Sequence, residues 1–170
     1  WGLNVVTGFR PNEIDMFGLD PIPRDERYVR AAEFTAMMDR LWRSETDVTF
    51  EGEHWSVKDA YVSPKPVHGR PVLVNAGSSD AGLAYAAKYS DLIFITSPGG
   101  AEIGAALDSL PAHTARIKAR AAQEGREIRT IINPHVICRD TEREVEQVCQ
   151  TILDGEDAPA VDSLVGTMRH

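Results

Sequence analysis

The sequence predicts an α/β protein with a parallel β-sheet. Its main apolar segments are continuous runs rather than alternating ones, which is typical of parallel strands buried on both faces. Most of these runs are followed by a stretch in which apolar residues recur at helical spacing, and repeated strand–helix units predict a parallel sheet. The composition agrees, because 42% of the 170 residues are hydrophobic and 26% are charged, as in an ordinary globular chain.

The first part of the chain is predicted to form a strand, a long loop and a helix. The strand is the β-branched run Gly2–Thr7, which Gly8 closes. Three prolines and a glycine make residues 9–24 a loop, and long loops in compact domains often have a function. Asp25 is predicted to cap the following helix, whose apolar residues recur at helical spacing as far as Trp42.

A small β-hairpin is predicted next, over Thr46–Val62, with its turn at Gly52. Three strand–helix units follow it. Their strands are predicted at Pro71–Ala76, Asp91–Thr96 and Ile128–Cys138, and their helices at Leu83–Tyr89, at about Ala101–Glu124 with a break or bend near Pro111, and from a cap at Asp140 or Thr141 to a stop near Gly155.

These units predict the central part of a (β/α)8 TIM barrel with a small β-hairpin insertion. Four strand–helix units in about 155 residues are half of such a barrel. The rival architecture, a doubly wound sheet, normally has a G-x-G-x-x-G turn after its first strand, and Thr7–Pro11 does not match that pattern. Because the chain starts at Trp1 without a methionine, we expect residues 1–170 to be a single incomplete barrel domain that lacks its N-terminal and C-terminal parts.

Charge and composition narrow the function classes. The net charge of -8 argues against nucleic acid or an anionic membrane as the main partner. There is no apolar run of about 18 residues, so no membrane span is predicted. Two cysteines give no disulfide framework and fit a cytoplasmic protein. No metal is expected, because no ligand spacing connects His54, His68 and His113.

The candidate site residues stand at the carboxyl ends of the predicted strands, where parallel α/β folds place their sites. Gly77, Ser78 and Ser79 lie between a strand and a helix, and free amides with two hydroxyls there suit a phosphate. The alternative is that one serine only caps the helix, and both interpretations stay open.

Two further strands carry polar side chains within apolar runs. Asn4 either contacts a heterocyclic ligand or makes a structural hydrogen bond. Strand alternation places Asn133 and His135 on one face of the last strand, where the histidine is either an acid–base group or a core residue.

Taken in order, several motifs resemble the bacterial luciferase-like flavin monooxygenases. The resemblance spans nearly the whole chain, and the branches it is most similar to are the dimethylsulfone, pyrimidine and alkanesulfonate monooxygenases. The motifs are Leu3–Phe9, Asn12-Glu13, Met16–Gly18, Asp25–Tyr28, Phe50–Trp55, Ser63–Pro66, Asn75–Gly82 and Asn133–Arg139.

The resemblance implies a role for each matching residue. Asn4 matches a residue that contacts the flavin ring, and Glu13 matches one in the loop that borders the flavin. The remaining implied positions are Arg27 and Tyr28 at the ribityl chain and phosphate, Gly77, Ser78 and Ser79 in the phosphate turn, and His135 lining the active site as the catalytic residue.

The implied activity is a two-component monooxygenation, in which a separate flavin reductase supplies reduced FMN and O2 oxygenates a small organic substrate. Asn133 stands where the alkanesulfonate branch has an arginine, which favours a neutral sulfone-like or pyrimidine-like substrate over a sulfonate. The pyrimidine branch tends to have an apolar residue at position 135, which counts mildly against that option. We also expect a homo-oligomer. The alternatives are a deazaflavin-dependent oxidoreductase on the same barrel and a non-catalytic flavin-binding relative.

Overall fold

The computed structural model describes residues 1–8, 10–100 and 102–168. The chain divides into two compact units, Trp1–Ile132 and Asn133–His170. Some positions used above lie outside the described residues, namely Phe9 of the first motif, Ala101 at the expected start of a helix, and Arg169 and His170.

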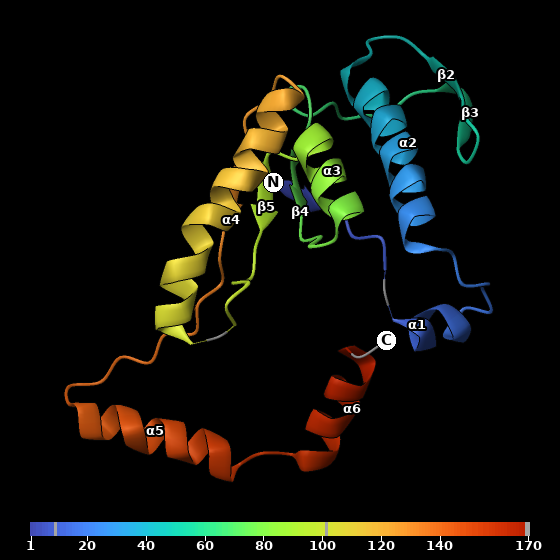
Figure 1. The fold of residues 1–170 in the computed structure, drawn as a ribbon. Coiled ribbons are helices and arrows are strands. Elements are labelled where there is room, and N and C mark those ends of the chain that lie inside the picture. The colour runs from blue at the N-terminus through green and yellow to red at the C-terminus, as the bar shows by residue number, and fades with distance from the viewer. Residues whose placement is uncertain (9, 101, 169–170) are drawn as a thin grey trace. The chain divides into compact units, whose positions relative to one another are not determined.

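The first unit contains a parallel four-stranded sheet with the strand order β1-β4-β5-β6 (Figure 1). Adjacent strands are in parallel register, with Leu3 opposite Leu73 and Asn75 opposite Ile93. The predicted α/β class with a parallel sheet is therefore confirmed. The elements of this unit are β1 (Gly2–Asn4), α1 (Pro11–Met16), α2 (Arg24–Arg43), β2 (Val48–Glu51), β3 (Ser56–Ala60), β4 (Val72–Asn75), α3 (Asp80–Tyr89), β5 (Leu92–Phe94), α4 (Ile103–Gln123) and β6 (Arg129–Ile131).

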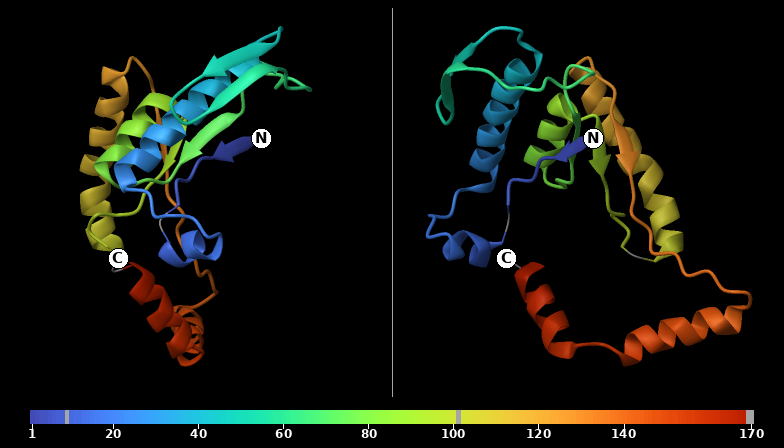
Figure 2. Two further views of the ribbon diagram at one scale, coloured as in Figure 1. Left: turned by 90° about the vertical axis from the view of Figure 1, so that its right-hand side faces the viewer. Right: turned by 180° about the vertical axis from the view of Figure 1, so that it is seen from behind.

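The main core lies between the sheet and the helices α3 and α4, which cover one of its faces (Figure 2). Ile93 of β5 is fully buried there, and Ala86 of α3 and Ala121 of α4 are also fully buried. Small alanines let the two helices approach the sheet and each other closely. This packing fixes the positions of β4 and β5, and therefore the place where their carboxyl ends lie.

Asp91 links β4 to β5 at the amino ends of these strands, at the end of the sheet opposite their carboxyl ends. Its two carboxylate oxygens accept hydrogen bonds from Arg70 at 2.6 Å each, and it also accepts from the Leu73 N–H at 2.9 Å and from Arg126 at 3.1 Å. Partial burial opposes ionisation of Asp91, but these donors, Arg70 foremost, outweigh it and hold the pKa of the carboxyl below its usual value.

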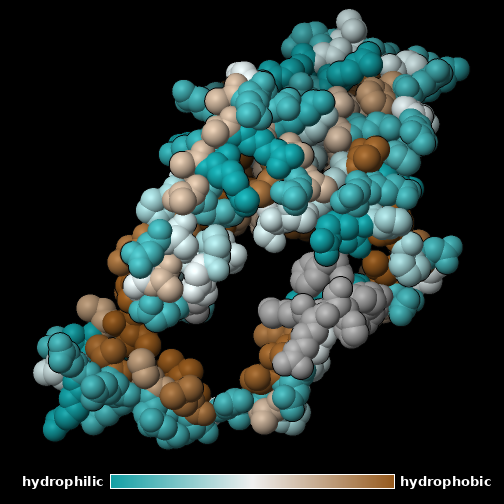
Figure 3. Space-filling view, viewed as in Figure 1, coloured by the Kyte–Doolittle hydropathy of each residue, from teal (hydrophilic) through white to brown (hydrophobic). Residues whose placement is uncertain are grey.

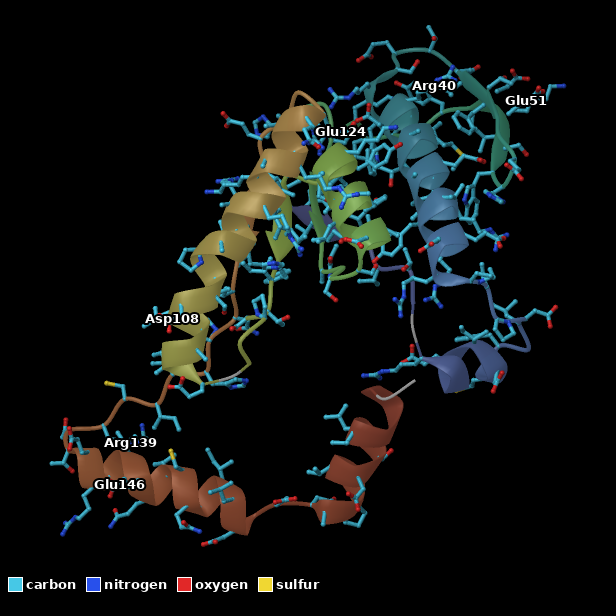
Figure 4. All side chains as sticks on the ribbon, in the orientation of Figure 1. Arg40, Glu51, Asp108, Glu124, Arg139 and Glu146 are labelled. Carbon is cyan, nitrogen blue, oxygen red and sulfur yellow. The ribbon has the colours of Figure 1, made fainter. Side chains whose placement is uncertain are left out.

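The predicted hairpin is present as the antiparallel pair β2–β3, with Phe50 opposite Val57. Val48 packs with Leu41 of α2 in a second, smaller core. Arg40, labelled on α2 in Figure 4, places its guanidinium carbon 5.7 Å from the centre of the Phe50 ring. The hairpin therefore packs directly on α2.

Two predictions near the N-terminus were wrong. The segment 9–24 is not all loop, because α1 begins at a proline and has Glu13 in its first turn, both of which favour a helix start. Asp25 is not the cap of α2. That helix begins at Arg24, after Pro23, without a side-chain cap, and Asp25 and Glu26 instead lie in its first turn.

The strand predicted at Ile128–Cys138 is much shorter, since β6 ends at Ile131. Pro134 lacks an N–H group and cannot continue a ladder. The inference that Asn133 and His135 share one strand face was therefore wrong, and both side chains are exposed. The end of the helix before β6 was predicted closely, because α4 ends at Gln123, two residues before Gly125, which has a φ of 67°. The break considered near Pro111 is absent, since α4 continues through this proline.

The second unit contains α5 (Glu142–Asp154) and α6 (Ala158–Met168). Thr141 caps α5 in a capping box with Glu144, as one of the two predicted caps, whereas α6 was not predicted. Figure 3 shows hydrophobic residues gathered along one side of α5, where Ile152 and Leu153 are exposed. In the described parts of both units, no helix is long and apolar enough to cross a membrane.

Candidate functional site

The turn between β4 and α3 is held by the side chain of Asn75. This residue is only 1% exposed. Its Nδ2 donates to the Val5 carbonyl at 2.9 Å, and its Oδ1 accepts from the Gly77 N–H at 2.7 Å. Asn75 therefore ties the chain after β1 to the turn after β4, at the carboxyl edge of the sheet. Asn75 lies in the Asn75–Gly82 motif but was not predicted to be a site residue.

Tyr28 of α2 lies against the same turn. Its hydroxyl is so close to Gly77 that a Cβ on this glycine would collide with it, and a Cβ on Gly82 would lie 2.7 Å from it. The Cα of Gly82 would also lie 2.9 Å from a Cβ on Gly77. Only glycine fits at these two positions, and the structure thus brings the predicted residues Tyr28 and Gly77 together.

Ser79 is the N-cap of α3, because its Oγ accepts the Gly82 N–H at 3.2 Å. The capping role expected for one of the two serines is therefore confirmed for Ser79. A hydroxyl that accepts one hydrogen bond still has its own proton to donate, so capping does not exclude contact with an anion. Ser78, next to it, is exposed.

The helix that follows β5, α4, has a charged N-cap, whereas α3 has a neutral one. Glu102 caps α4, and its carboxylate accepts the N–H groups of Gly104 and Ala105 at 2.8 and 2.7 Å. These two donors, Ala105 first, lower the pKa of Glu102. A carboxylate already accepts the first N–H groups of α4. α3 begins with a neutral cap, and the carboxylate in its first turn, Asp80, is exposed, so α3 is the better anion site of the two.

A mostly buried tyrosine, Tyr85 of α3, packs against Tyr28. The rings of Tyr28 and Tyr85 are 5.8 Å apart, and the Tyr85 hydroxyl shares a 2.7 Å hydrogen bond with Thr35 of α2. Burial raises the pKa of Tyr85, so the hydroxyl is neutral at physiological pH. This contact fixes α2 against α3 beside the turn.

Asn4 and Arg27 line a cleft of about 820 Å³ in the first unit, between β1 and α2. Asn4 is exposed rather than buried, so the buried polar group that needs partners in this region is Asn75 instead. Arg27 is half-buried, and its Nε has no hydrogen-bond partner in the described part of the chain.

The two remaining predicted residues, Glu13 and His135, are both exposed. Glu13, on α1, is exposed and forms an ion pair with Arg10 at 3.1 Å. His135 is exposed in the second unit, outside any strand or helix. Over the described ranges, no group of three or more histidine, cysteine, aspartate or glutamate side chains could hold a metal ion.

The parallel sheet and the polar turn after β4 define a parallel α/β protein with a candidate site at the carboxyl ends of its strands. The family model described as luciferase-like monooxygenase matches residues 1–165. The chain therefore belongs to the luciferase-like monooxygenase family, and the resemblance found in the sequence is confirmed.

Two curated relatives are similar over almost the whole chain. An FMNH(2)-dependent dimethylsulfone monooxygenase of Pseudomonas fluorescens (strain Pf0-1) is 32% identical over 161 residues, which are 95% of this chain and 42% of the relative. Pyrimidine monooxygenase RutA of Acinetobacter baylyi is 32% identical over 173 residues, which are 97% of this chain and 44% of the relative. The chain thus spans less than half the length of these relatives.

Solved structures show the same fold. The crystal structure of DmoA from Hyphomicrobium sulfonivorans matches with a TM-score of 0.81 at 21% identity, over 97% of this chain and 39% of that one. The structural neighbours are TIM barrels, so the prediction of a partial barrel is confirmed.

Proposed function

We propose that this chain is part of a two-component flavin-dependent monooxygenase, which uses reduced FMN from a separate reductase and O2 to oxygenate a small neutral organic substrate. When bound, reduced FMN supplies the chemistry that activates O2 for transfer of one oxygen atom. The chain itself binds the phosphate, orients the ring and keeps water away from it.

The fit of the turn after β4 to a phosphate carries this proposal. Two glycines leave no side chain over the turn, and the Tyr28 hydroxyl already lies beside them. Ser79 retains a proton to donate. Arg27, which lines the cleft between β1 and α2, has a buried Nε without a partner in the described residues, and this suits a guanidinium that binds an anion.

The other predicted residues take their roles from the resemblance. Asn4 contacts the flavin ring from the cleft, Glu13 borders it, and Ser78 completes the turn. His135 holds or moves a proton at the substrate. The names of the two curated relatives support a sulfone-like or a pyrimidine-like substrate.

The remaining parts of the proposal concern the whole protein. Residues 1–170 form a single incomplete TIM-barrel domain in a cytoplasmic homo-oligomer. Its partners are the substrate and the flavin reductase, and it needs neither nucleic acid nor a membrane.

A matched pair of capping variants tests the cofactor site in the intact protein. Ser79→Ala and Thr141→Ala each remove an N-cap, at a cost of about 1 kcal/mol in stability. Only Ser79→Ala removes a phosphate contact, and we expect it to weaken FMN binding by about 1.5–3 kcal/mol, roughly tenfold to a hundredfold. Titration with FMN, followed by flavin fluorescence, measures the FMN affinity of both variants. Equal FMN affinity in the two variants would show that Ser79 is only a cap.

Oxygen consumption tests the reaction itself. With reduced FMN, we expect O2 uptake that rises with dimethylsulfone or with a pyrimidine such as uracil and yields an oxygenated product. Bound FMN with no substrate-dependent uptake would indicate a non-catalytic flavin-binding protein. A bound deazaflavin, recognised from its absorption spectrum, would favour the oxidoreductase alternative.

A further inference from the structure

The helices α2 and α3 lie side by side (Figure 1) and meet at the turn after β4. Tyr28 and Thr35 are seven residues apart on α2, which places both on one face of that helix. Gly82 and Tyr85 are three residues apart on α3 and likewise share a face. The Tyr28 hydroxyl lies beside Gly82, where a Cβ would be 2.7 Å from it. One end of this helix–helix interface is therefore part of the candidate cofactor site.

Further along the same interface, two buried hydroxyl groups form a hydrogen bond. Thr35 of α2 and Tyr85 of α3 are each 4% exposed, and their hydroxyl oxygens are 2.7 Å apart. A buried hydroxyl that loses its partner is costly, because water does not replace the lost bond. Sliding of α2 along α3 would break this bond, so the bond fixes the register of one helix against the other.

The ring of Tyr85 connects this hydrogen bond to Tyr28. Its centre lies 5.8 Å from that of the Tyr28 ring and 5.2 Å from that of the Tyr89 ring, so Tyr85 contacts an aromatic ring on each helix. An aromatic side chain has only two rotatable bonds, and these contacts together with Thr35 restrain both its ring and its hydroxyl. Tyr85 therefore presents a fixed surface against which the Tyr28 ring packs.

We propose that Thr35 and Tyr85 are positioning residues for the cofactor phosphate, because their hydrogen bond holds α2 where the Tyr28 hydroxyl reaches a phosphate in the turn. This inference rests on the proposed function, which places the FMN phosphate there. Neither residue needs to touch the phosphate, since both act through Tyr28. The positioning has to be accurate, because a shift of about 1 Å is enough to lose a hydrogen bond. The pair thereby favours a phosphorylated flavin over an unphosphorylated one.

Binding of FMN and of riboflavin, which is FMN without its phosphate, tests this inference in the intact protein. Thr35→Val removes the hydroxyl and keeps the shape of the side chain, while Thr35→Ser keeps the hydroxyl and is the matched control. We expect Thr35→Val to weaken FMN by roughly fivefold and to leave riboflavin affinity unchanged, because part of a hydrogen bond to the phosphate is lost. Thr35→Ser should retain most of the FMN affinity. Titrations followed by flavin fluorescence measure both ligands.

Tyr28→Phe separates positioning from a general loosening of the fold. Alone it should weaken FMN by roughly tenfold. Added to Tyr28→Phe, Thr35→Val should weaken FMN no further, although it still lowers the melting temperature. Equal weakening by Thr35→Val in both backgrounds, or equal weakening of riboflavin, would show a merely structural role and overturn the inference. An effect of Tyr28→Phe without one of Thr35→Val would overturn this inference alone, whereas no effect of Tyr28→Phe would overturn the proposed phosphate site as well.

Discussion

The side-chain amide of Asn75 connects two segments of the candidate site, so we expect its removal to affect both stability and cofactor binding. Asn75→Ala removes one hydrogen bond to the Val5 carbonyl and one from the Gly77 N–H. Each neutral hydrogen bond contributes about 1 kcal/mol, and a stranded buried partner costs about 1 kcal/mol more. Because Asn75 is only 1% exposed, water does not replace the lost amide. We therefore expect the free energy of unfolding to fall by about 2–4 kcal/mol.

Urea unfolding and FMN titration of the intact protein measure this effect together. Asn75→Ala should lower the urea midpoint and also weaken FMN, because the turn that holds Gly77 loses its anchor. Asn133→Ala, at an exposed asparagine of the second unit, controls for the loss of an amide alone. An urea midpoint equal to that of the unmodified protein would refute this reasoning.

Asn75→Asp separates the two hydrogen bonds by pH. A carboxylate keeps the acceptor for Gly77 but turns a second oxygen toward the Val5 carbonyl, which raises the pKa of the new acid in the folded state. The protonated acid can donate to that carbonyl. Relative to the unmodified protein, the variant should therefore be least destabilised at pH values below about 4, the ordinary pKa of aspartate, and the loss of stability should grow as the pH rises through the raised value. A difference from the unmodified protein that shrinks as the pH rises in this range would contradict the assignment.

The remaining predictions concern three other parts of the chain. Asp91→Asn should lower the free energy of unfolding by about 2 kcal/mol and leave FMN affinity unchanged, because Asp91 lies at the edge away from the turn. Since its folded-state pKa is lowered, its contribution is present above about pH 4 and is lost as the pH falls through the lower value, so urea midpoints of the variant should change less with acid. His135→Ala should lower turnover by roughly 10²-fold with FMN affinity nearly unchanged, whereas normal turnover in both His135→Ala and His135→Gln would make it structural. Residues 1–170 alone should aggregate in light scattering, because β1 and β6 are edge strands and α5 exposes Ile152 and Leu153, and a monodisperse, cooperatively unfolding monomer would contradict this.

Features that depend on local sequence were predicted well. The runs around Leu73 and Ile93 are apolar throughout, which is typical of parallel strands and can be recognised without knowing the neighbours. In the structure Leu73 and Ile93 are buried, whereas Val72 and Phe94 are exposed. The capping box of Thr141 and Glu144 and the positive φ of Gly125 are likewise properties of a few adjacent residues. The fold class follows from such signals once they repeat along the chain.

Features that depend on distant contacts were not predicted. The run from Ile128 to Cys138 is apolar enough for a long strand, yet β6 ends at Ile131. A strand extends only as far as a neighbour is present to pair with it, and β5 ends at Phe94, opposite Ile131. The alternation that placed Asn133 beside His135 assumed a partner strand that the described residues do not supply.

The two asparagines near the carboxyl edge show the same limit at the site. Asn4 and Asn75 both follow apolar residues in predicted strands, but only Asn4 was considered as a polar side chain that needs a partner. In the structure Asn75 lies on a central strand, where the Val5 carbonyl and the Gly77 N–H both need a partner, while Asn4 lies on the edge strand beside the cleft. Burial thus assigns the structural amide to Asn75 and leaves the Asn4 amide free to meet a ligand. That division of roles depends on strand order, which no pattern within either strand encodes.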